Sequence, residues 1–219
     1  ATHCIYNNKG FIYLTMKKST RIGVVIAIVL IAAFAALAEW LVVRNDAITK
    51  APNGLIASVK IGGPFTLVDH KGRAVTEQDY LGSFVLVFFG YTFCPDVCPT
   101  ALGDIAQAID ELGSDSVGVI PLMITIDPER DTPAVLAEYV PLFHDRFIGL
   151  TGTKKQIKDI ADLYRIFFSR VESTQYTYYL MDHTSFVYLL NPEGNVVSLF
   201  RYGTSPKEIA LNIRKRLRD

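Results

Sequence analysis

The sequence predicts an α/β fold in which a largely parallel sheet is covered by helices. A continuous apolar run at 84–89 and a second, largely apolar run at 117–126 are typical of strands that are buried on both faces of a sheet. The first run is followed by apolar residues at helical spacing from 98 to 112, and the second by a Thr-Pro pair that favours the start of another helix. Strands that alternate with helices in this way indicate parallel βαβ units.

Further segments add hairpins at both ends of this core. A turn at 69–72 separates two short strands, and Asn-Pro-Glu-Gly-Asn at 191–195 separates two longer ones, so each pair is expected to form an antiparallel hairpin. Residues 176–179 are expected to form an inserted hairpin or loop. The strands predicted outside the two apolar runs are 65–68, 74–75, 147–150, 186–190 and 196–201.

Four helices are predicted from their terminal signals. The first ends near Gly113, and the second begins at Pro133 with the preceding Asp or Thr as its cap. The third follows Thr153 and its apolar stripe extends to Phe168, and the last follows Ser205. A hairpin, three βα units, a second hairpin and a final helix describe a thioredoxin-like sheet with helices on both faces.

The formal net charge is zero, with 22 basic and 22 acidic side chains, but the charge is unevenly distributed. Residues 1–44 carry five basic side chains and one acid, which leaves 17 basic and 21 acidic side chains, a net of −4, in the remainder. The one basic run there, 214–218, is the expected polar end of a last helix. Nucleic-acid binding is therefore excluded.

Residues 22–38 form a long apolar segment without charge. If this segment continues to Val43 as a helix, it rises about 33 Å, which matches the hydrocarbon thickness of a bilayer. Lys17, Lys18 and Arg21 precede it, so the positive-inside rule places the N-terminus in the cytoplasm and the rest of the chain outside. The sequence therefore predicts a single transmembrane helix ahead of the α/β domain.

The predicted organisation is a cytoplasmic N-terminus at 1–21, a transmembrane anchor at 22–43, a linker at 44–63 and a thioredoxin-like domain at 64–219. A cleaved signal peptide is the alternative, because Ala-Leu-Ala at the end of the apolar segment has the small-x-small pattern. The first 15 residues fit neither interpretation, and the Met-Lys-Lys that follows them resembles a natural start, so whether these residues are native stays open. Without an arginine-rich transit segment, we expect a bacterial inner-membrane protein with its domain in the periplasm.

Cys94 and Cys98 lie where a buried strand leads into a helix. The free N–H groups and the dipole of a helix N-terminus stabilise thiolates, and a spacing of four places both sulfur atoms on one helical face. Two such thiols could share a soft metal ion or close a disulfide, and the sequence permits both. Alternatively, the two cysteines could simply continue the buried stripe of the helix.

His183 precedes the strand at 186–190, and in a thioredoxin-like topology this brings it toward the two cysteines. His70 and His144 lie in ordinary solvent-exposed settings and are not expected at this crevice. Two thiolates and one imidazole suit copper and also accept zinc, although structural zinc usually requires a fourth ligand.

Three motifs in the expected order resemble those of the Sco/SenC family of copper chaperones for cytochrome c oxidase assembly. Residues 89–99 (Phe-Gly-Tyr-Thr-Phe-Cys-Pro-Asp-Val-Cys-Pro) resemble the first motif, 127–133 (Asp-Pro-Glu-Arg-Asp-Thr-Pro) the second, and Asp182-His183 the third. Thr184 stands where many members have serine. The resemblance covers the chain from about Pro64 to its end.

This resemblance implies a membrane-tethered metallochaperone with a thioredoxin-like fold. It implies that Cys94, Cys98 and His183 hold Cu(I) or Cu(II) and deliver it to the binuclear copper site of cytochrome c oxidase subunit II, with other copper chaperones as further partners. The stretch 127–133 is expected to carry no ligand and to form a helix-capping turn beside the site, with partner docking as the alternative. Asp182 is a candidate for orienting the imidazole.

A thiol–disulfide oxidoreductase is the main alternative function, with Cys94 as the attacking thiolate and Cys98 as the resolving thiol. It would reduce the cysteines of the oxidase subunit or act in redox signalling. Three intervening residues count against it, since thioredoxin-type exchange uses two. A thioredoxin-like peroxidase is a third hypothesis, so whether the protein is an enzyme stays open. The aromatic segment 176–179 is a candidate for docking a partner.

Overall fold

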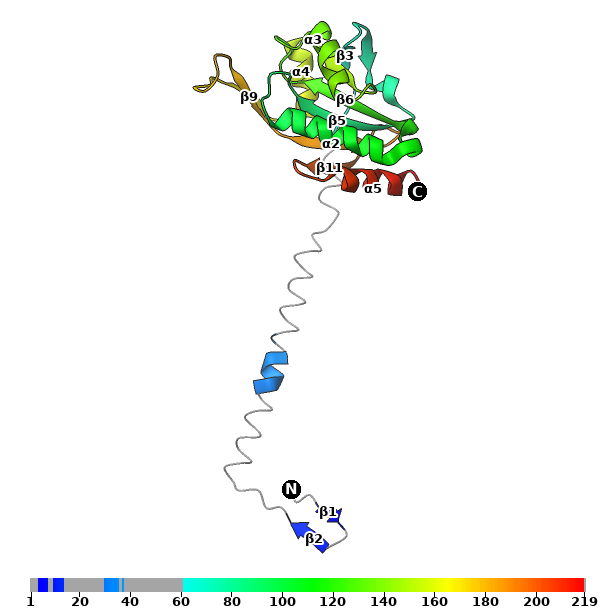
Figure 1. The fold of residues 1–219 in the computed structure, drawn as a ribbon, viewed down its shortest axis with the longest axis vertical. Coiled ribbons are helices and arrows are strands. Elements are labelled where there is room, and N and C mark those ends of the chain that lie inside the picture. The colour runs from blue at the N-terminus through cyan, green and yellow to red at the C-terminus, as the bar shows by residue number, and fades with distance from the viewer. Residues whose placement is uncertain (1–3, 8–9, 14–29, 36, 38–60, 219) are drawn as a thin grey trace. The chain divides into compact units, whose positions relative to one another are not determined.

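The computed structural model describes residues 4–7, 10–13, 30–35, 37 and 61–218, and Figure 1 shows its fold. The chain divides into two compact units, Ala1–Val59 and Lys60–Asp219, which we describe separately.

In the first unit, β1 (Cys4–Asn7) pairs with β2 (Gly10–Tyr13) in an antiparallel hairpin that sequence reasoning did not predict. Residues 30–35 are helical. Most of the predicted anchor at 22–43, and the linker up to residue 60, lie outside the described residues. Within the described ranges, we find no helix that is both long enough and apolar enough to cross a membrane.

The second unit is built on a seven-stranded sheet with the strand order β11-β10-β5-β6-β7-β3-β4. The three central strands β5, β6 and β7 are parallel, whereas β10 is antiparallel to β5 and β3 is antiparallel to β7. This arrangement confirms the predicted α/β fold. The strands of the sheet are β3 (Thr66–Asp69), β4 (Ala74–Thr76), β5 (Phe84–Gly90), β6 (Val119–Thr125), β7 (Ile148–Thr151), β10 (Phe186–Leu190) and β11 (Val196–Arg201).

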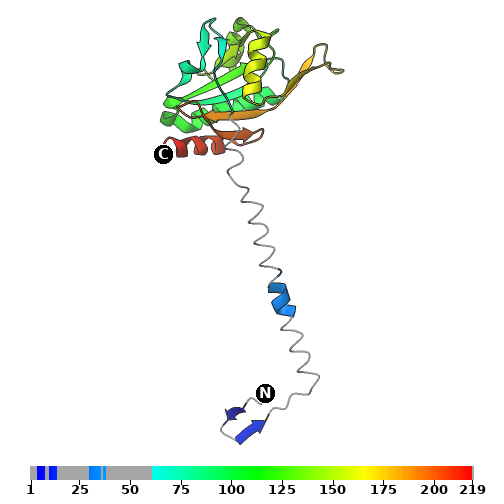
Figure 2. The same cartoon turned by 180° about the vertical axis from the view of Figure 1, so that it is seen from behind.

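Helices cover both faces of this sheet. The two longest, α2 and α5, lie side by side on one face (Figure 1), and α4 covers the opposite face, as the view from behind shows (Figure 2). Every residue of β5 is buried between these layers, as predicted. The α-helices of this unit are α2 (Val97–Leu112), α3 (Pro133–Tyr139), α4 (Lys154–Leu163) and α5 (Pro206–Arg216).

The predicted helix starts are confirmed by their caps. The Thr132 side chain accepts a hydrogen bond from the N–H of Val135, Thr153 forms a capping box with Gln156, and the Ser205 side chain caps α5. Local signals of this kind depend on residues three positions apart, so they can be read from the sequence.

The predicted end of the third helix is wrong. Helix α4 ends at Leu163, and Arg165 then adopts a left-handed conformation with φ of 59°. Phe167 is therefore not part of a buried helical stripe but is 85% exposed. Phe168 begins β8 (Phe168–Val171), which pairs with β9 (Leu180–His183) in the inserted hairpin that was expected around 176–179.

Gly90 allows helix α2 to pack closely against the end of β5. A Cβ atom at this position would lie 2.6 Å from Cε1 of Phe88 and 3.0 Å from Sγ of Cys98. Because both neighbours are buried, neither side chain has room to move away. The glycine is thus required where the cysteine helix meets the central strand.

We predict that Gly90→Ala lowers the free energy of unfolding by about 1–3 kcal/mol, because the added methyl group overpacks this contact. Gly103→Ala is the matched control, since Gly103 lies inside α2 and a Cβ there would meet no atom within 4 Å. This control should raise stability by roughly 0.5–1 kcal/mol through helix propensity. Urea unfolding of the full chain, followed by circular dichroism, measures both. Equal effects of the two substitutions would contradict the proposed close contact.

Candidate metal centre

The two cysteines of the predicted site lie at the junction of β5 and α2. Cys94 is half-buried in the connecting loop, whereas Cys98 is fully buried in the first turn of the helix. The backbone N–H of Cys98 donates to Sγ of Cys94 at 3.3 Å. Asp96, the N-cap residue, makes no side-chain capping bond, so the sulfur of Cys94 accepts one of the free N–H groups of the helix start.

Hydrogen bonds give the two thiols opposite acidities. The pKa of Cys94 is well below its usual value, chiefly because the Cys98 thiol donates to it, with His183 and backbone N–H groups adding to the effect against the cost of burial. The pKa of Cys98 is raised, because Cys98 is the donor in this bond and is buried. The lowered pKa favours the thiolate at Cys94, and the raised pKa favours the thiol at Cys98.

His183 completes the group from a distant part of the chain. It is the last residue of β9, and its Nε2 lies 3.5 Å from Sγ of Cys98. Its Nδ1 lies 3.1 Å from the carbonyl oxygen of Thr184. In the copper-free site, an Nε2–H can donate to the sulfur atoms. To act as a metal ligand, the ring must instead carry its proton on Nδ1, where the Thr184 carbonyl accepts it, and present the lone pair of Nε2.

The expectation that Asp182 orients the imidazole is wrong. Asp182 is exposed, and the oxygen beside Nδ1 belongs to the backbone of Thr184. In an extended strand successive side chains point to opposite sides, so the neighbour of His183 in β9 faces away from it. The serine-to-threonine departure noted in the sequence leaves this backbone contact intact.

Aromatic rings enclose the imidazole. The rings of Phe88 and Tyr91 meet the His183 ring edge-on, with centroids 6.2 Å and 6.0 Å away. The Tyr91 hydroxyl accepts a hydrogen bond from the N–H of Met181 at 3.1 Å, which ties the loop after β5 to strand β9. Burial raises the pKa of Tyr91 to about 12, so its hydroxyl stays protonated. The site therefore lies in a surrounding of low polarity.

Asp131 was not predicted to fix the cysteine loop. Its carboxylate is fully buried and accepts hydrogen bonds from the Thr92 N–H at 3.1 Å, the Thr92 hydroxyl at 2.6 Å and the Thr125 hydroxyl at 2.6 Å. Burial raises the pKa of Asp131, and these three hydrogen bonds oppose that effect. The expected helix-capping turn is present at Thr132. The contact between Asp131 and Thr92 could not be predicted, because no local sequence pattern indicates it.

The three predicted ligands are neighbours without being a closed ligand set. Two tetrahedral ligands with bonds of about 2.0 and 2.3 Å to one ion lie roughly 3.5 Å apart, which the Cys98–His183 pair already satisfies. Nevertheless, among the residues described here, no three His, Cys, Asp or Glu side chains form a group that could hold an ion as they stand. The side chains would have to move together to close on a metal.

The competing histidines are engaged in other parts of the fold. Nδ1 of His70 accepts a hydrogen bond from the Gly149 N–H at 3.1 Å, and Nδ1 of His144 accepts one from the Arg146 N–H at 3.1 Å. Both rings are half-buried rather than solvent-exposed as expected. In both rings, Nδ1 accepts a hydrogen bond from a backbone N–H group.

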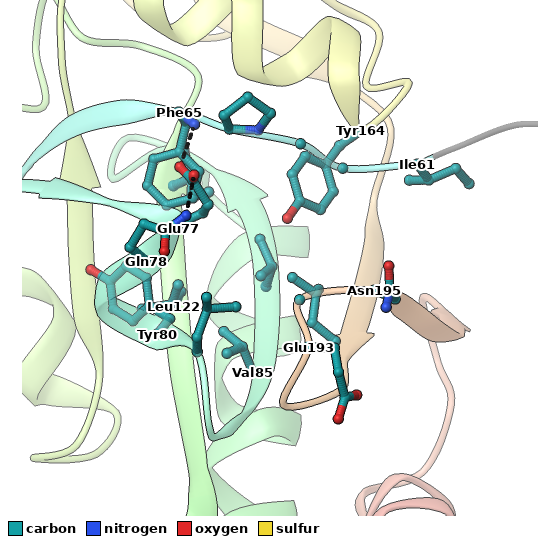
Figure 3. A pocket seen from close by; sticks show the side chains of 18 residues that line it. Ile61, Phe65, Glu77, Gln78, Tyr80, Val85, Leu122, Tyr164, Glu193 and Asn195 are labelled. Atoms are coloured by element: carbon teal, nitrogen blue, oxygen red, sulfur yellow. Dashed lines mark hydrogen bonds between the residues drawn. The ribbon is translucent and has the colours of Figure 1, made fainter.

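A cavity of about 230 Å³ lies elsewhere, and none of the three candidate ligands lines it (Figure 3). Val85 in the first half of β5 and Leu122 of β6 form part of its wall, whereas the cysteines follow the other end of β5. The Tyr164 hydroxyl points into this space (Figure 3). The cavity and the cysteine site are therefore separate.

We predict that Cys94 in the copper-free protein reacts with iodoacetamide almost as fast at about pH 6 as at about pH 8, because its thiolate persists across this range. An ordinary thiol would slow by roughly 50- to 100-fold over the same interval. Peptide mapping by mass spectrometry gives the rate at each cysteine. In Cys98→Ala the pH dependence should partly return, since the main donor is lost; an ordinary thiol profile in the parent chain would contradict the arrangement.

The comparisons with known proteins agree on one family. Residues 54–218 match the SCO1/SenC family. The SCO2-like protein of Rickettsia felis is 42% identical over 153 residues, which cover 69% of this chain and 75% of that protein. The crystal structure of Arabidopsis thaliana ScoI with copper bound is similar, with a TM-score of 0.69 and 40% identity over 72% of this chain and 98% of that chain.

A more distant structure shares the fold alone. BsSco, described as a member of the Sco family of cytochrome c oxidase assembly proteins, has a TM-score of 0.57 and 22% identity over 72% of this chain and 94% of that chain. The family match covers well over half of the sequence, and the Rickettsia relative is similar over most of its length. This chain therefore belongs to the SCO1/SenC family.

Proposed function

We propose that this protein is a metallochaperone that binds one copper ion through Cys94, Cys98 and His183 and passes the ion on as cargo. The observation that carries the proposal is the 3.5 Å contact between Sγ of Cys98 and Nε2 of His183, which lie 85 residues apart in the sequence. Two sulfur donors and one imidazole nitrogen are soft to borderline ligands, which suit Cu(I) and accept Cu(II). Related proteins hold copper in their crystal structures.

The protonation state of the site suits an ion that is taken up and released. The Cys94 thiolate can bind copper first, because it is already ionised and half-exposed. The Cys98 thiol must then lose its proton to become the second sulfur ligand, so uptake releases a proton and reprotonation favours release. Three protein ligands leave the ion open to an incoming ligand from a recipient, unlike a closed structural site.

We propose the binuclear copper site of cytochrome c oxidase subunit II as the recipient, with other copper chaperones as further partners. Support comes from the three motifs at 89–99, 127–133 and 182–183, which resemble those of copper chaperones for cytochrome c oxidase assembly, and from the copper held by a related protein that is 40% identical. We further propose that the chain is anchored in a bacterial inner membrane through 22–43, with its domain in the periplasm. The length and apolar character of that segment support this placement.

A thiol–disulfide reductase is the second candidate, and the polarised cysteine pair supports it. The Cys94 thiolate would attack a disulfide of the recipient, forming a mixed disulfide and releasing one thiolate. Cys98, after losing its proton, would then displace the second recipient sulfur and leave a Cys94–Cys98 disulfide. The raised pKa and complete burial of Cys98 disfavour this second step. The chaperone role therefore ranks first.

We predict that the reduced chain binds one copper ion and that His183→Ala weakens binding by about 100-fold or more, as Cys94→Ala and Cys98→Ala do, because each removes a direct ligand. His144→Ala is the matched control and should bind like the parent, since its ring serves a distant turn. Competition with a chromophoric copper chelator gives the affinities. If His183→Ala bound as tightly as His144→Ala, the three-ligand site would be wrong.

The lower rank of the reductase role gives a separate prediction. With copper rigorously excluded, the reduced chain should reduce the disulfide form of the recipient's copper-site cysteines only slowly, since Cys98 is a poor resolving thiol. The accumulation of a mixed disulfide at Cys94 can be followed by mass spectrometry. Rapid turnover that survives His183→Ala would favour redox chemistry over copper delivery.

A further inference from the structure

Arg130 is a buried cation beside the site. It is not one of the proposed copper ligands, and it takes no part in the cap of helix α3, which Thr132 forms. It lies in the turn between β6 and α3, and its side chain is only 15% exposed. Its Nη2 atom is fully buried and has no hydrogen-bond partner among the described residues. A buried, incompletely satisfied guanidinium is costly, so its position calls for an explanation.

One side of the Arg130 guanidinium holds the chain that leads into β9. Its Nη1 donates to the carbonyl oxygen of Tyr179 at 2.9 Å, and its central carbon lies 3.6 Å from the centroid of the Tyr179 ring. Tyr179 immediately precedes β9, the four-residue strand that ends at His183. The guanidinium thus contacts both the backbone and the ring at the start of this strand.

The other contacts of Arg130 are with the cysteine loop. Its central carbon lies 4.6 Å from the ring centroid of Phe93 and 5.7 Å from that of Tyr91. Phe93 is the residue before Cys94, and the Tyr91 hydroxyl accepts the N–H of Met181 in β9. One planar cation therefore lies between the two segments that carry the candidate ligands.

An ion pair fixes the guanidinium in this place. Its Nε donates to one oxygen of the buried Asp127 carboxylate, and the other oxygen of that carboxylate accepts a hydrogen bond from the Tyr179 hydroxyl at 2.9 Å. Asp127, Arg130 and Tyr179 thus form a closed ring of interactions. A lysine could pair with Asp127, but it lacks the planar fork that reaches the Tyr179 carbonyl at the same time.

We propose that Arg130 is a positioning residue that holds strand β9, and with it His183, against the loop that carries Cys94. The inference rests on the proposed copper site, but it concerns the copper-free protein as well, because the clamp acts on the hairpin itself. Arg130 touches none of the three ligands and acts on them through Tyr179, Phe93 and Tyr91.

Arg170 provides a matched control for a cation on the same aromatic ring. Its guanidinium carbon lies 3.8 Å from the Tyr179 ring centroid, but its side chain is half-exposed and pairs with Glu172. Among the described residues it makes no contact with the cysteine loop comparable to that of Arg130. Arg170→Met therefore removes a stacked cation without removing the connection between the two segments.

The test compares Arg130→Lys, Arg130→Met and Arg170→Met in the full chain. Arg130→Lys keeps a positive charge for Asp127, so this variant should fold even if Arg130→Met, which leaves a buried carboxylate unpaired, does not. In the copper-free state, amide hydrogen exchange at 180–183 should accelerate about tenfold or more in Arg130→Lys and remain near the parent rate in Arg170→Met. Exchange in β5 should be unchanged, which separates loss of the clamp from general destabilisation.

Copper affinity provides the second readout. Arg130→Lys should weaken copper binding by about 10-fold or more, in the range expected for residues that orient ligands. In a His183→Ala background the same substitution should change affinity by less than about 2-fold, because the clamp then has no histidine to position. Arg170→Met should bind copper like the parent chain.

Unchanged exchange at 180–183 in Arg130→Lys would overturn the clamp. So would an equal loss of copper affinity with and without His183, since Arg130 would then act by another route. If His183→Ala alone left copper binding intact, the proposed copper site would fail, and the exchange measurements would still decide whether Arg130 holds the hairpin.

Discussion

The burial of the Cys98 sulfur between β5 and β9 is the constraint on which the rest of the site depends. The sulfur lies against Gly90 at the end of the central strand and 3.5 Å from Nε2 of His183 at the end of the inserted hairpin. A helix start, the middle of the sheet and a distant hairpin therefore meet at one atom. Because that atom is fully buried, it cannot turn toward solvent, and the other two elements must keep their positions around it.

The two cysteines differ in burial, because Cys98 is fully buried and Cys94 is half-buried. Cys94 is the accessible thiolate and Cys98 is the buried thiol, so the pair is asymmetric before any ion arrives. Two groups that share one proton lose it when a metal binds, which couples copper loading to proton release. Such coupling suits a cargo site better than a permanent cofactor site.

Local and periodic features could be predicted from the sequence, and long-range polar contacts could not. The buried strand β5, the caps at Thr132 and Thr153 and the position of the cysteines at a helix start follow from neighbouring residues, and the structure confirms them. The contacts of Arg130 with Tyr179, which is 49 residues away, and of Asp131 with Thr92, which is 39 residues away, leave no local pattern. The approach of His183 to Cys98 was predicted only through topology and family resemblance.

The most direct test of the central claim is X-ray absorption at the copper edge of the copper-loaded chain. The account predicts a first shell of two sulfur atoms and one imidazole nitrogen, with the nitrogen lost in His183→Ala and retained in His144→Ala. A shell made of sulfur alone, or one that His183→Ala leaves unchanged, would contradict a site built from Cys94, Cys98 and His183.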